Sequence, residues 1–174
     1  LGAMTVNAGY GKNVLAMASS HFATAEKEFR FPLGYANQRP LSAHWTVTGS
    51  GAFIVGKNRS HVRITGVTVG KIVDYGLKDS QNMGACMAPA ACDTIIQNLE
   101  DFERKEEDYD RIITGDLGYV GQSILFDLLL EKGYDVHGII RRSSVDYRER
   151  IAHLEGKPHF HLHYADLGDS MSIV

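Results

Sequence analysis

The sequence predicts an α/β protein in which residues 109–174 form a mostly parallel sheet with helical connections. Three observations support this fold class. Residues 111–114 are short and β-branched and stop at a glycine, residues 118–132 have a helical apolar stripe, and residues 136–140 are almost all apolar, as a parallel strand covered on both faces requires. Because two parallel strands joined by one helix need a right-handed crossover, these residues are interpreted as a βαβ unit.

The predicted helix of this unit has a clear apolar face and a clear end. Gly133 follows it, and glycine is favoured just beyond a helix C-terminus. The apolar face consists of four residues at helical spacing, namely Ile124, Leu125, Leu128 and Leu129. The pattern therefore predicts one amphipathic helix packed on the sheet.

The connection to a third strand also has helical signals. Residues 146–149 have the Asp-x-x-Glu spacing of a capping box, which marks a helix N-terminus. Ile151 and Leu154 give that helix an apolar side, and Gly156 ends it. Residues 159–167 then read as the third strand, completing a βαβαβ pattern.

The turn between the first strand and its helix matches a phosphate-binding pattern. Its glycines stand where a backbone must bend tightly, approach a pyrophosphate and pack a helix closely. A helix N-terminus there offers free N–H groups and a positive dipole end to an anion. The residues of the pattern are Thr114, Gly115, Gly118 and Gly121. The glycines alone suit a ligand-free turn equally well, and both interpretations stay open.

Shorter strands and helices are predicted before this unit. Residues 13–18 are a candidate buried strand, and residues 23–29 suit a short helix. A loop rich in Gly, Asn and Pro follows at residues 33–43. Residues 45–55 read as a strand interrupted by the small residues 49–51.

A strand, a helix and an acidic linker complete the first part of the chain. Residues 63–73 alternate between the two faces of a predicted strand. Pro89 suits the first turn of a helix, whose apolar face would comprise Ala91, Ile95, Leu99 and Phe102. Residues 100–110 are acidic and polar, which indicates a solvated helix end and a linker.

The composition excludes several classes of function. A net charge of −3 with no long basic run argues against a nucleic-acid groove. No apolar run approaches the ~20 residues of a membrane span. No charged and then apolar leader precedes a small-residue cleavage site, so we expect a cytoplasmic protein. Cys86 and Cys92 have neither metal-ligand spacing nor the pattern of a disulfide framework.

Both ends of the chain have the pattern of interrupted elements. Residues 1–9 read like the tail of a helix that enters a turn, and residues 172–174 like the beginning of another helix. We therefore expect the chain to be an excerpt. Missing neighbours would leave apolar faces exposed, and such faces drive association, so a homodimer or a larger homo-oligomer is expected.

From about residue 9 to about residue 135, the chain resembles the stage V sporulation protein AD family, thiolase-like proteins of spore-forming bacteria. The matching segments are ASSHFATAEKEFRFP, TVTGSGAFIVG, ITGVTVGKIVDYGLKDSQNMG, MAPAACDTI and DYDRIITGDLGYVG. Their order and spacing make the resemblance specific. It implies a thiolase-like fold, a link to uptake of dipicolinic acid into the forespore, and binding of that dianion in a thiolase-type cleft.

From about residue 129 to residue 174, the chain is instead similar to the amino-terminal part of the GDP-mannose dehydratases, which are extended short-chain dehydrogenases. The matching segments are LLEKGYDVHGIIRRSS, RIAHLEG and LHYADLGDS. The crossover falls inside a helix that both families have. We interpret the chain as a hybrid of a thiolase-like fragment, residues 1–108, and a half Rossmann-like parallel βαβαβ unit, residues 109–174, which shares its first strand and helix with the thiolase-like family.

Each resemblance implies that decisive residues lie outside this chain. The nucleophilic cysteine position of the thiolase-like family should precede Leu1, and its His- and Asn-containing segment should follow residue 135. The Tyr-x-x-x-Lys pair of the dehydratases lies beyond Val174. We therefore expect no catalytic residue and no complete ligand cleft. The alternatives are a non-catalytic segment of a sporulation protein, an NADP-binding module without the catalytic Tyr and Lys, and a recombined chain that binds no ligand.

The dehydratase resemblance assigns further dinucleotide-binding positions. Arg141 and Arg142 follow the second strand, where a cationic residue accommodates the 2′-phosphate of NADP. Arg141 and Ser143 are the positions carried over, together with Asp166 for the adenine. A solvated arginine pair and a turn-forming aspartate are equally good readings of these residues.

The remaining candidates have weaker support. His21 follows a strand end, where binding residues often lie, although a structural histidine explains it as well. His159, His161 and His163 alternate on one strand face, but neighbours on a face are about 7 Å apart, so we expect no metal site. Cys86 precedes a predicted helix without a nearby His–Asn pattern, so catalysis by its thiol is not expected.

Overall fold

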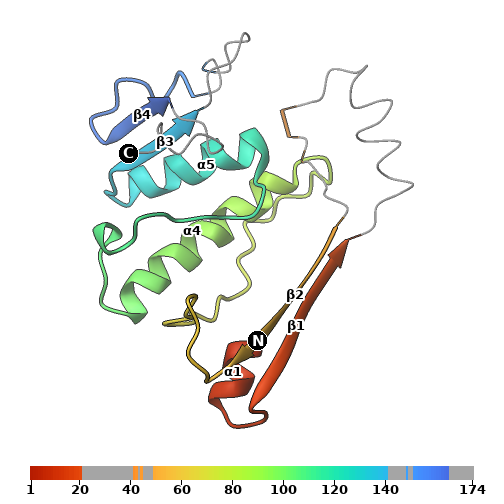
Figure 1. The fold of residues 1–174 in the computed structure, drawn as a ribbon. Helices are drawn as coiled ribbons and strands as arrows, with labels where there is room; N and C mark the ends of the chain where they lie inside the picture. The colour runs from red at the N-terminus through yellow and green to blue at the C-terminus, as the bar shows by residue number, and fades with distance from the viewer. Residues whose placement is uncertain (21–40, 43, 45–48, 141–147, 149–150, 165–174) are drawn as a thin grey trace. The chain divides into compact units, whose positions relative to one another are not determined.

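The computed structural model describes residues 1–20, 41–42, 44, 49–140, 148 and 151–164 (Figure 1). Helices and strands are mixed along the chain and the sheets are small, which confirms the α/β class. The elements are, in order, α1 (Gly2–Asn7), β1 (Asn13–Ser20), β2 (Gly49–Gly56), α4 (Met83–Asp101), η1 (Glu106–Asp108), α5 (Gly118–Glu131), β3 (Val136–Ile140) and β4 (Phe160–Tyr164).

The chain divides into two compact units. Among the described residues, the first unit contains residues 1–20, 49–70 and 96–112, and the second contains most of the rest, including residues 71–95 and 113–140. The sequence-derived division after residue 108 stays a prediction. Within the described ranges, no helix combines the length and the apolar character that crossing a bilayer requires.

The first unit contains a two-stranded antiparallel ribbon. β1 and β2 pair over their whole length, from Asn13 opposite Gly56 to Ser20 opposite Gly49. The strand predicted at residues 13–18 is therefore confirmed and continues to Ser20. The prediction that residues 49–51 interrupt the second strand is wrong, because they lie in the ladder of β2.

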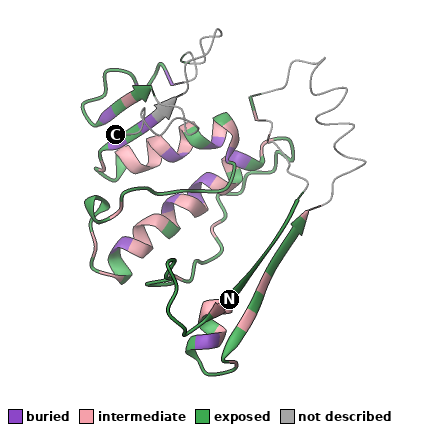
Figure 2. Ribbon diagram, viewed as in Figure 1, coloured by how far each residue is buried: buried purple, intermediate pink, exposed green. Residues whose placement is uncertain are grey.

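The ribbon is far more exposed than the sequence predicts. Leu15 and Met17 of β1 are 58% and 73% exposed, so the prediction of a buried strand is wrong (Figure 2). One face of the ribbon meets α1, where Gly2 lies beside methyl groups of Val14 and Val55. Within the first unit, α1 contacts both strands, whereas Leu15, Met17 and Ile54 on the second face are exposed.

The segment between β2 and α4 has no regular secondary structure. The prediction of a strand at residues 63–73 is wrong, because in the described chain this segment has no partner strand. Two anchors hold it near α4. The Asn98 amide donates a hydrogen bond to Oγ1 of Thr68 at 2.8 Å, and the ring of Phe102 lies directly against Gly66. Its alternating apolar residues are exposed.

α4 begins six residues before the start that Pro89 suggests. Asn82 acts as its N-cap, since its side-chain oxygen accepts the backbone N–H of Ala85 at 3.2 Å. Pro89 therefore lies inside the helix. The buried stripe consists of residues at helical spacing, namely Gly84, Ala88, Cys92 and Leu99. Of the predicted face, only Leu99 is fully buried.

The end of α4 is a Schellman turn with an unusual residue. The N–H of Arg104 donates to the carbonyl of Leu99 at 2.8 Å, and the N–H of Glu103 to that of Glu100 at 3.1 Å. Glu103 has a φ of 50°, the left-handed conformation that glycine normally supplies. The linker that follows is largely exposed, as its acidic composition predicts.

A polar network fixes this linker to the helix. The hydroxyl of Tyr109 donates to Oδ1 of Asn98 at 2.6 Å and accepts from Nη1 of Arg104 at 2.9 Å. The Arg104 guanidinium also lies over the rings of Phe102 and Tyr109, at 5.1 and 5.4 Å from their centroids. The hydrogen bond from Tyr109 to Asn98 therefore attaches the linker to α4.

In the second unit, α5 begins at the predicted residue and ends one residue before the predicted end. It begins at Gly118 and ends at Glu131, and Gly133 follows in a left-handed conformation with a φ of 88°. The N–H groups of Gly133 and Tyr134 donate to the carbonyls of Leu130 and Leu129, at 2.9 and 3.1 Å, which completes a second Schellman turn. The predicted helix stop is confirmed.

β3 and β4 form a parallel pair beside α5 (Figure 1). The second strand is confirmed at its predicted bounds, and the third is confirmed over Phe160–Tyr164. A small core joins the pair to α5. It consists of Val136, Ile151, Leu154 and Phe160, with Phe126, Leu129, Leu130 and Leu162 packed around it.

Two further predicted elements are not formed by the described residues. Residues 111–114 are exposed and form no strand, because the described chain offers them no pairing partner. Residues 151–156 are consecutive turns and not a helix, although Ile151 and Leu154 are buried as predicted and Gly156 has a φ of 87°. The helix at residues 23–29, most of the loop at residues 33–43, and the capping box at residues 146–149 lie outside the described residues.

Candidate functional site

The glycine turn leads directly into α5. Gly118 has a φ of 61°, which only glycine adopts without strain, and it is the first residue of the helix. Oδ1 of Asp116 accepts the N–H of Gly118 at 2.8 Å, while the hydroxyl of Thr114 donates to the carbonyl of Gly115 at 2.9 Å. A carboxylate of the chain itself thus occupies one of the N–H groups that an anion would use.

Gly121 allows a close approach, but to a different element from the one predicted. A Cβ on Gly121 would stand 2.7 Å from the carbonyl oxygen of Gly84 in α4, and a Cβ on Gly84 would overlap the carbonyl oxygen of Leu117. The pattern TGxxGxxG predicts contact with a preceding strand. In this chain, Gly121 instead allows α5 to pack closely against α4.

The other predicted nucleotide-binding residues cannot be placed against this turn. Arg141, Ser143 and Asp166 lie outside the described residues, and so does His21. Their assignments therefore stay predictions. The described candidates are Thr114 and Gly115 in the turn, and Gly118 and Gly121 in the first residues of α5.

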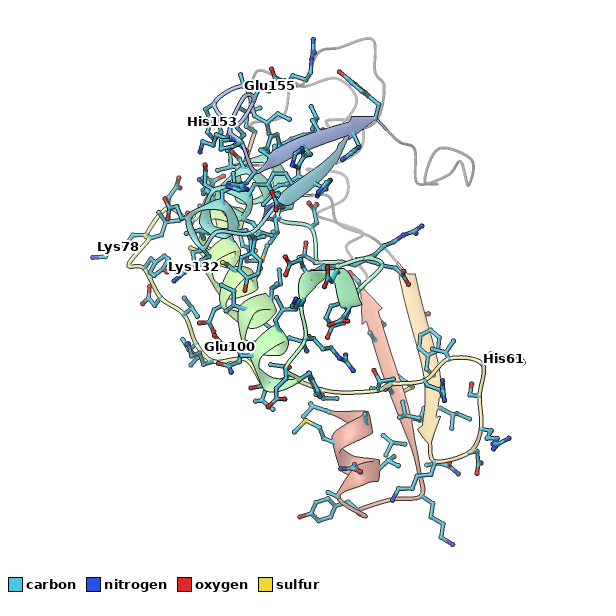
Figure 3. The ribbon with its side chains drawn as sticks, turned by 90° about the vertical axis from the view of Figure 1, so that its left-hand side faces the viewer. His61, Lys78, Glu100, Lys132, His153 and Glu155 are labelled. Atoms are coloured by element: carbon cyan, nitrogen blue, oxygen red, sulfur yellow. The ribbon has the colours of Figure 1, made fainter. Side chains whose placement is uncertain are left out.

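A charged cluster lies on α5 that was not predicted from the sequence. Oδ1 of Asp127 lies 3.0 Å from Nζ of Lys157, and Oδ2 lies 3.0 Å from Nε2 of His153, which projects from the turns before β4 (Figure 3). The hydroxyl of Ser123 is 3.4 Å from the same histidine nitrogen. Because one ring nitrogen meets both Ser123 and Asp127, the three groups cannot act as a nucleophilic triad.

The electrostatics of this cluster favour a structural role. Partial burial raises the pKa of Asp127, but hydrogen bonds from Lys157 and His153 outweigh that effect and hold the pKa below its usual value. The carboxylate therefore stays ionised and ties α5 to the segment before β4. The i and i+4 spacing of Ser123 and Asp127 was the only sequence signal for it.

Histidines gather on the exposed face of β3 and β4. Nδ1 of His137 lies 2.8 Å from Nε2 of His163, and Nδ1 of His159 lies 2.9 Å from Oδ1 of Asp135. The hydrogen bond from His159 is the main cause that lowers the pKa of Asp135. The alternating pattern of residues 159–163 indicated three of these histidines, whereas no pattern in the sequence indicated that His137 lies beside them.

The two cysteines lie in different environments. Cys92 is buried in α4, and burial raises the pKa of its thiol. Cys86 is exposed, and its Sγ lies 3.9 Å from the carbonyl oxygen of Leu77. Among the described residues, no group of three His, Cys, Asp or Glu side chains is arranged to hold a metal ion.

Comparison with known proteins decides which family the chain comes from. The model of the family described as Stage V sporulation protein AD (SpoVAD) matches residues 1–143. The chain belongs to the stage V sporulation protein AD family. The stage V sporulation protein AD of Bacillus subtilis is 50% identical over 131 residues, which cover 75% of this chain and 39% of that protein. The chain thus spans well under half of this relative.

The second resemblance is also confirmed. The GDP-mannose 4,6 dehydratase of Cricetulus griseus is 44% identical over 93 residues, covering 50% of this chain and 24% of that enzyme. The GDP-mannose 4,6-dehydratase of Vibrio cholerae is 51% identical over 68 residues, covering 36% of this chain and 18% of that enzyme. One chain therefore has similarity to two different kinds of protein.

Proposed function

We propose that this chain is a non-catalytic segment of a sporulation protein that serves the uptake of dipicolinic acid into spores. The observation that carries the proposal is the family match over residues 1–143, with 50% identity to the Bacillus subtilis protein. The thiolase-like resemblance supplies the finer role. The segment would keep the local fold of the family without its complete ligand cleft.

The environment of Cys92 supports a role without catalysis. A thiolase-type reaction needs a thiolate nucleophile, because the protonated thiol attacks poorly. Burial of Cys92 in α4 favours the protonated form. The same burial among Gly84, Ala88 and Leu99 on the stripe of α4 suits a packing residue.

Calorimetric titration with dipicolinate tests the proposal. The complete Bacillus subtilis relative serves as the comparison protein, and this chain is titrated under the same conditions. We expect the complete protein to give a saturable signal and this chain to give none below millimolar concentration. Acyl-transfer activity of the chain, or dipicolinate binding equal to that of the complete protein, would contradict the proposal.

The second candidate function is binding of NADP. It is favoured by the dehydratase similarity, by the parallel pairing of β3 with β4, and by the turn at Gly118 that opens α5. Asp116 opposes it, since its carboxylate occupies the N–H of Gly118 and would repel a phosphate. The strand that should precede the turn is also missing at residues 111–114. These two points place NADP binding second.

Titration with NADP and NAD tests this alternative. If the turn binds a dinucleotide, Arg141 would bond the 2′-phosphate and favour NADP roughly tenfold, since about 1.4 kcal/mol is a factor of ten. Arg141→Ala should then remove that preference, whereas Gly118→Val should abolish binding of both cofactors. Absence of NADP affinity at millimolar concentration would leave the turn without this function.

Self-association and location complete the proposal. The second face of the β1–β2 ribbon exposes Leu15, Met17 and Ile54, and exposed apolar patches of this kind favour association. We therefore propose a homo-oligomer in the cytoplasm, associated with the forespore through the family's role in sporulation. Light scattering that gave the monomer mass at high protein concentration would overturn the oligomer.

A further inference from the structure

The face of β3 and β4 that points away from α5 carries a row of histidines. Side chains alternate along a strand, so residues of opposite parity lie on opposite faces. Phe126 of α5 lies beside Gly138 and packs against the ring of Phe160, at 5.8 Å between ring centroids, which marks the face covered by α5. His137 of β3 and His163 of β4 lie on the other face.

These side chains are in direct contact across the two strands. The register places His137 opposite His161 and one pleat before His163. The ring of His137 is stacked with both, at 4.7 Å from the centroid of His161 and 5.1 Å from that of His163. Nδ1 of His137 and Nε2 of His163 are 2.8 Å apart, which is hydrogen-bonding distance.

A contact between two ring nitrogens requires one proton between them. In the neutral imidazoles, one ring donates its N–H and the other accepts with its lone pair. One added proton on the pair can preserve the bond, because a cationic ring still donates to a neutral one and the bond becomes charge-assisted. A second added proton removes the last acceptor lone pair and places two cations in contact.

We propose that His137 and His163 form a shared-proton pair that ties β3 to β4 and opens when both rings are protonated. Histidine is the side chain that ordinarily changes charge between pH 5 and 8, so acidification is the condition that would open the pair. The pair is thus a pH-sensitive contact between two strands that residues 141–159 connect in the sequence.

A charged side chain also lies beside the pair on this face. Asp135 and His159 share this face by parity, and Oδ1 of Asp135 lies 2.9 Å from His159 and 3.8 Å from His161. The carboxylate of Asp135 therefore contacts those two rings and not the rings of the pair. α5, which carries Tyr119, Asp127 and Glu131 and has Lys132 as its C-cap, packs on the opposite side of the sheet.

Proton NMR titration of the whole chain tests the shared proton. Two coupled groups titrate in two steps that belong to the pair, and the ring signals of both residues follow both steps. We expect this behaviour for His137 and His163 on acidification, and His61, an exposed histidine in another segment, is recorded as the reference. In His163→Gln, the curve of His137 should become a single step.

Unfolding by urea at several pH values gives an independent readout. The unfolded chain binds one proton more than a native pair that resists the second proton, so stability should fall with acid. Because one proton is involved, the ratio of folded to unfolded wild-type protein should fall by at most tenfold for each pH unit, compared with the same ratio for His163→Gln. His61→Gln, the matched control, should leave the wild-type pH dependence unchanged. Independent single-step titration of His137 and His163, or an identical pH dependence in His163→Gln, would overturn the proposal.

Discussion

Gly121 of α5 lies so close to the backbone of Gly84 in α4 that a side chain fits on neither residue. A Cβ on Gly121 would stand 2.7 to 2.8 Å from three backbone atoms of Gly84, and a Cβ on Gly84 would overlap the carbonyl oxygen of Leu117. The contact joins α4 to the start of α5. It therefore fixes the position of the glycine turn.

The first prediction concerns this helix contact. Gly84→Ala and Gly121→Ala should each destabilise the protein by about 1–3 kcal/mol, because the added methyl group meets backbone atoms that cannot move aside. Helix propensity alone predicts the opposite sign, since Ala favours a helix by about 1 kcal/mol over Gly. Urea unfolding of each variant measures the difference.

Gly115→Ala provides the control for this prediction. Nothing lies within 4 Å of a Cβ built at Gly115, so the exchange should change the free energy of unfolding by less than about 0.5 kcal/mol. Variants at Gly84 and Gly121 that are as stable as Gly115→Ala would show that the helices separate at little cost.

Local signals in the sequence predicted the second unit well. The apolar run of β3, the helical stripe of α5 and the stop at Gly133 depend on neighbouring residues, and all three elements lie where these signals place them. The cap at Asn82 was the overlooked local signal. It outweighs the preference of Pro89 for a first turn, because a helix with a satisfied N-terminus can contain a proline beyond it.

Elements that need a distant partner were predicted poorly. Residues 63–73 and 111–114 have strand patterns, but a strand forms only when another strand completes its hydrogen bonds. The prediction that β1 is buried failed for the same reason. The apolar pattern of a strand predicts which residues are apolar and not which element covers them. The candidate turn was predictable from its glycines, whereas the capture of the Gly118 N–H by Asp116 was not.

The second prediction concerns the left-handed residue that ends α4. Glu103→Gly should stabilise the protein by about 1 kcal/mol, since a residue with a Cβ costs roughly 1–2 kcal/mol in this conformation. The gain is reduced because glycine loses more backbone entropy on folding. Thermal or urea unfolding measures the change.

Gly133 is the matched position for this comparison. It occupies the same place at the end of α5 with a φ of 88°, so Gly133→Glu should destabilise by a similar amount. If both exchanges left stability unchanged, the two helix ends would not be held in left-handed conformations in solution.

The third prediction concerns the ionised carboxylate that links α5 to the turns before β4. Asp127→Asn should weaken its contacts with Lys157 and His153 and cost about 0.5–1 kcal/mol, as expected for half-exposed ion pairs. The contact between Lys71 and Asp93 is the matched control, because it is an ion pair on another helix. Asp93→Asn should cost less, since Asp93 has one such contact.

The same carboxylate has a predicted pH dependence. The pKa of Asp127 is below its usual value in the folded chain, so the unfolded chain binds protons first as the pH falls. Its contribution to stability is complete above the unfolded pKa of about 3.9 and is lost as the pH falls through the lower folded pKa. Asp127→Asn should therefore differ from wild type at pH 6 and approach it near pH 2. A constant difference over this range would contradict the assignment.

The fourth prediction concerns Asp116 in the glycine turn. Asp116→Ala removes the acceptor that holds the Gly118 N–H and removes a negative charge from the helix N-terminus. If the turn can bind an anion, affinity for pyrophosphate and for NADP should rise about tenfold, equivalent to about 1.4 kcal/mol. The loss of the hydrogen bond should cost about 0.5–1.5 kcal/mol of stability. Calorimetric titration and urea unfolding measure the two effects separately.

Two further variants show whether Asp116 acts through its position or only through its charge. Asp110→Ala removes the same charge from an exposed residue of the preceding linker, so it should leave affinity nearly unchanged. Asp116→Asn removes the charge but retains an oxygen that can accept the Gly118 N–H, so its affinity should lie between those of wild type and Asp116→Ala. Equal affinities in all three variants, or no binding in any of them, would mean that the turn only connects the chain to α5. The sporulation-family interpretation would then account for the glycines by packing alone, through the contact of Gly121 with Gly84.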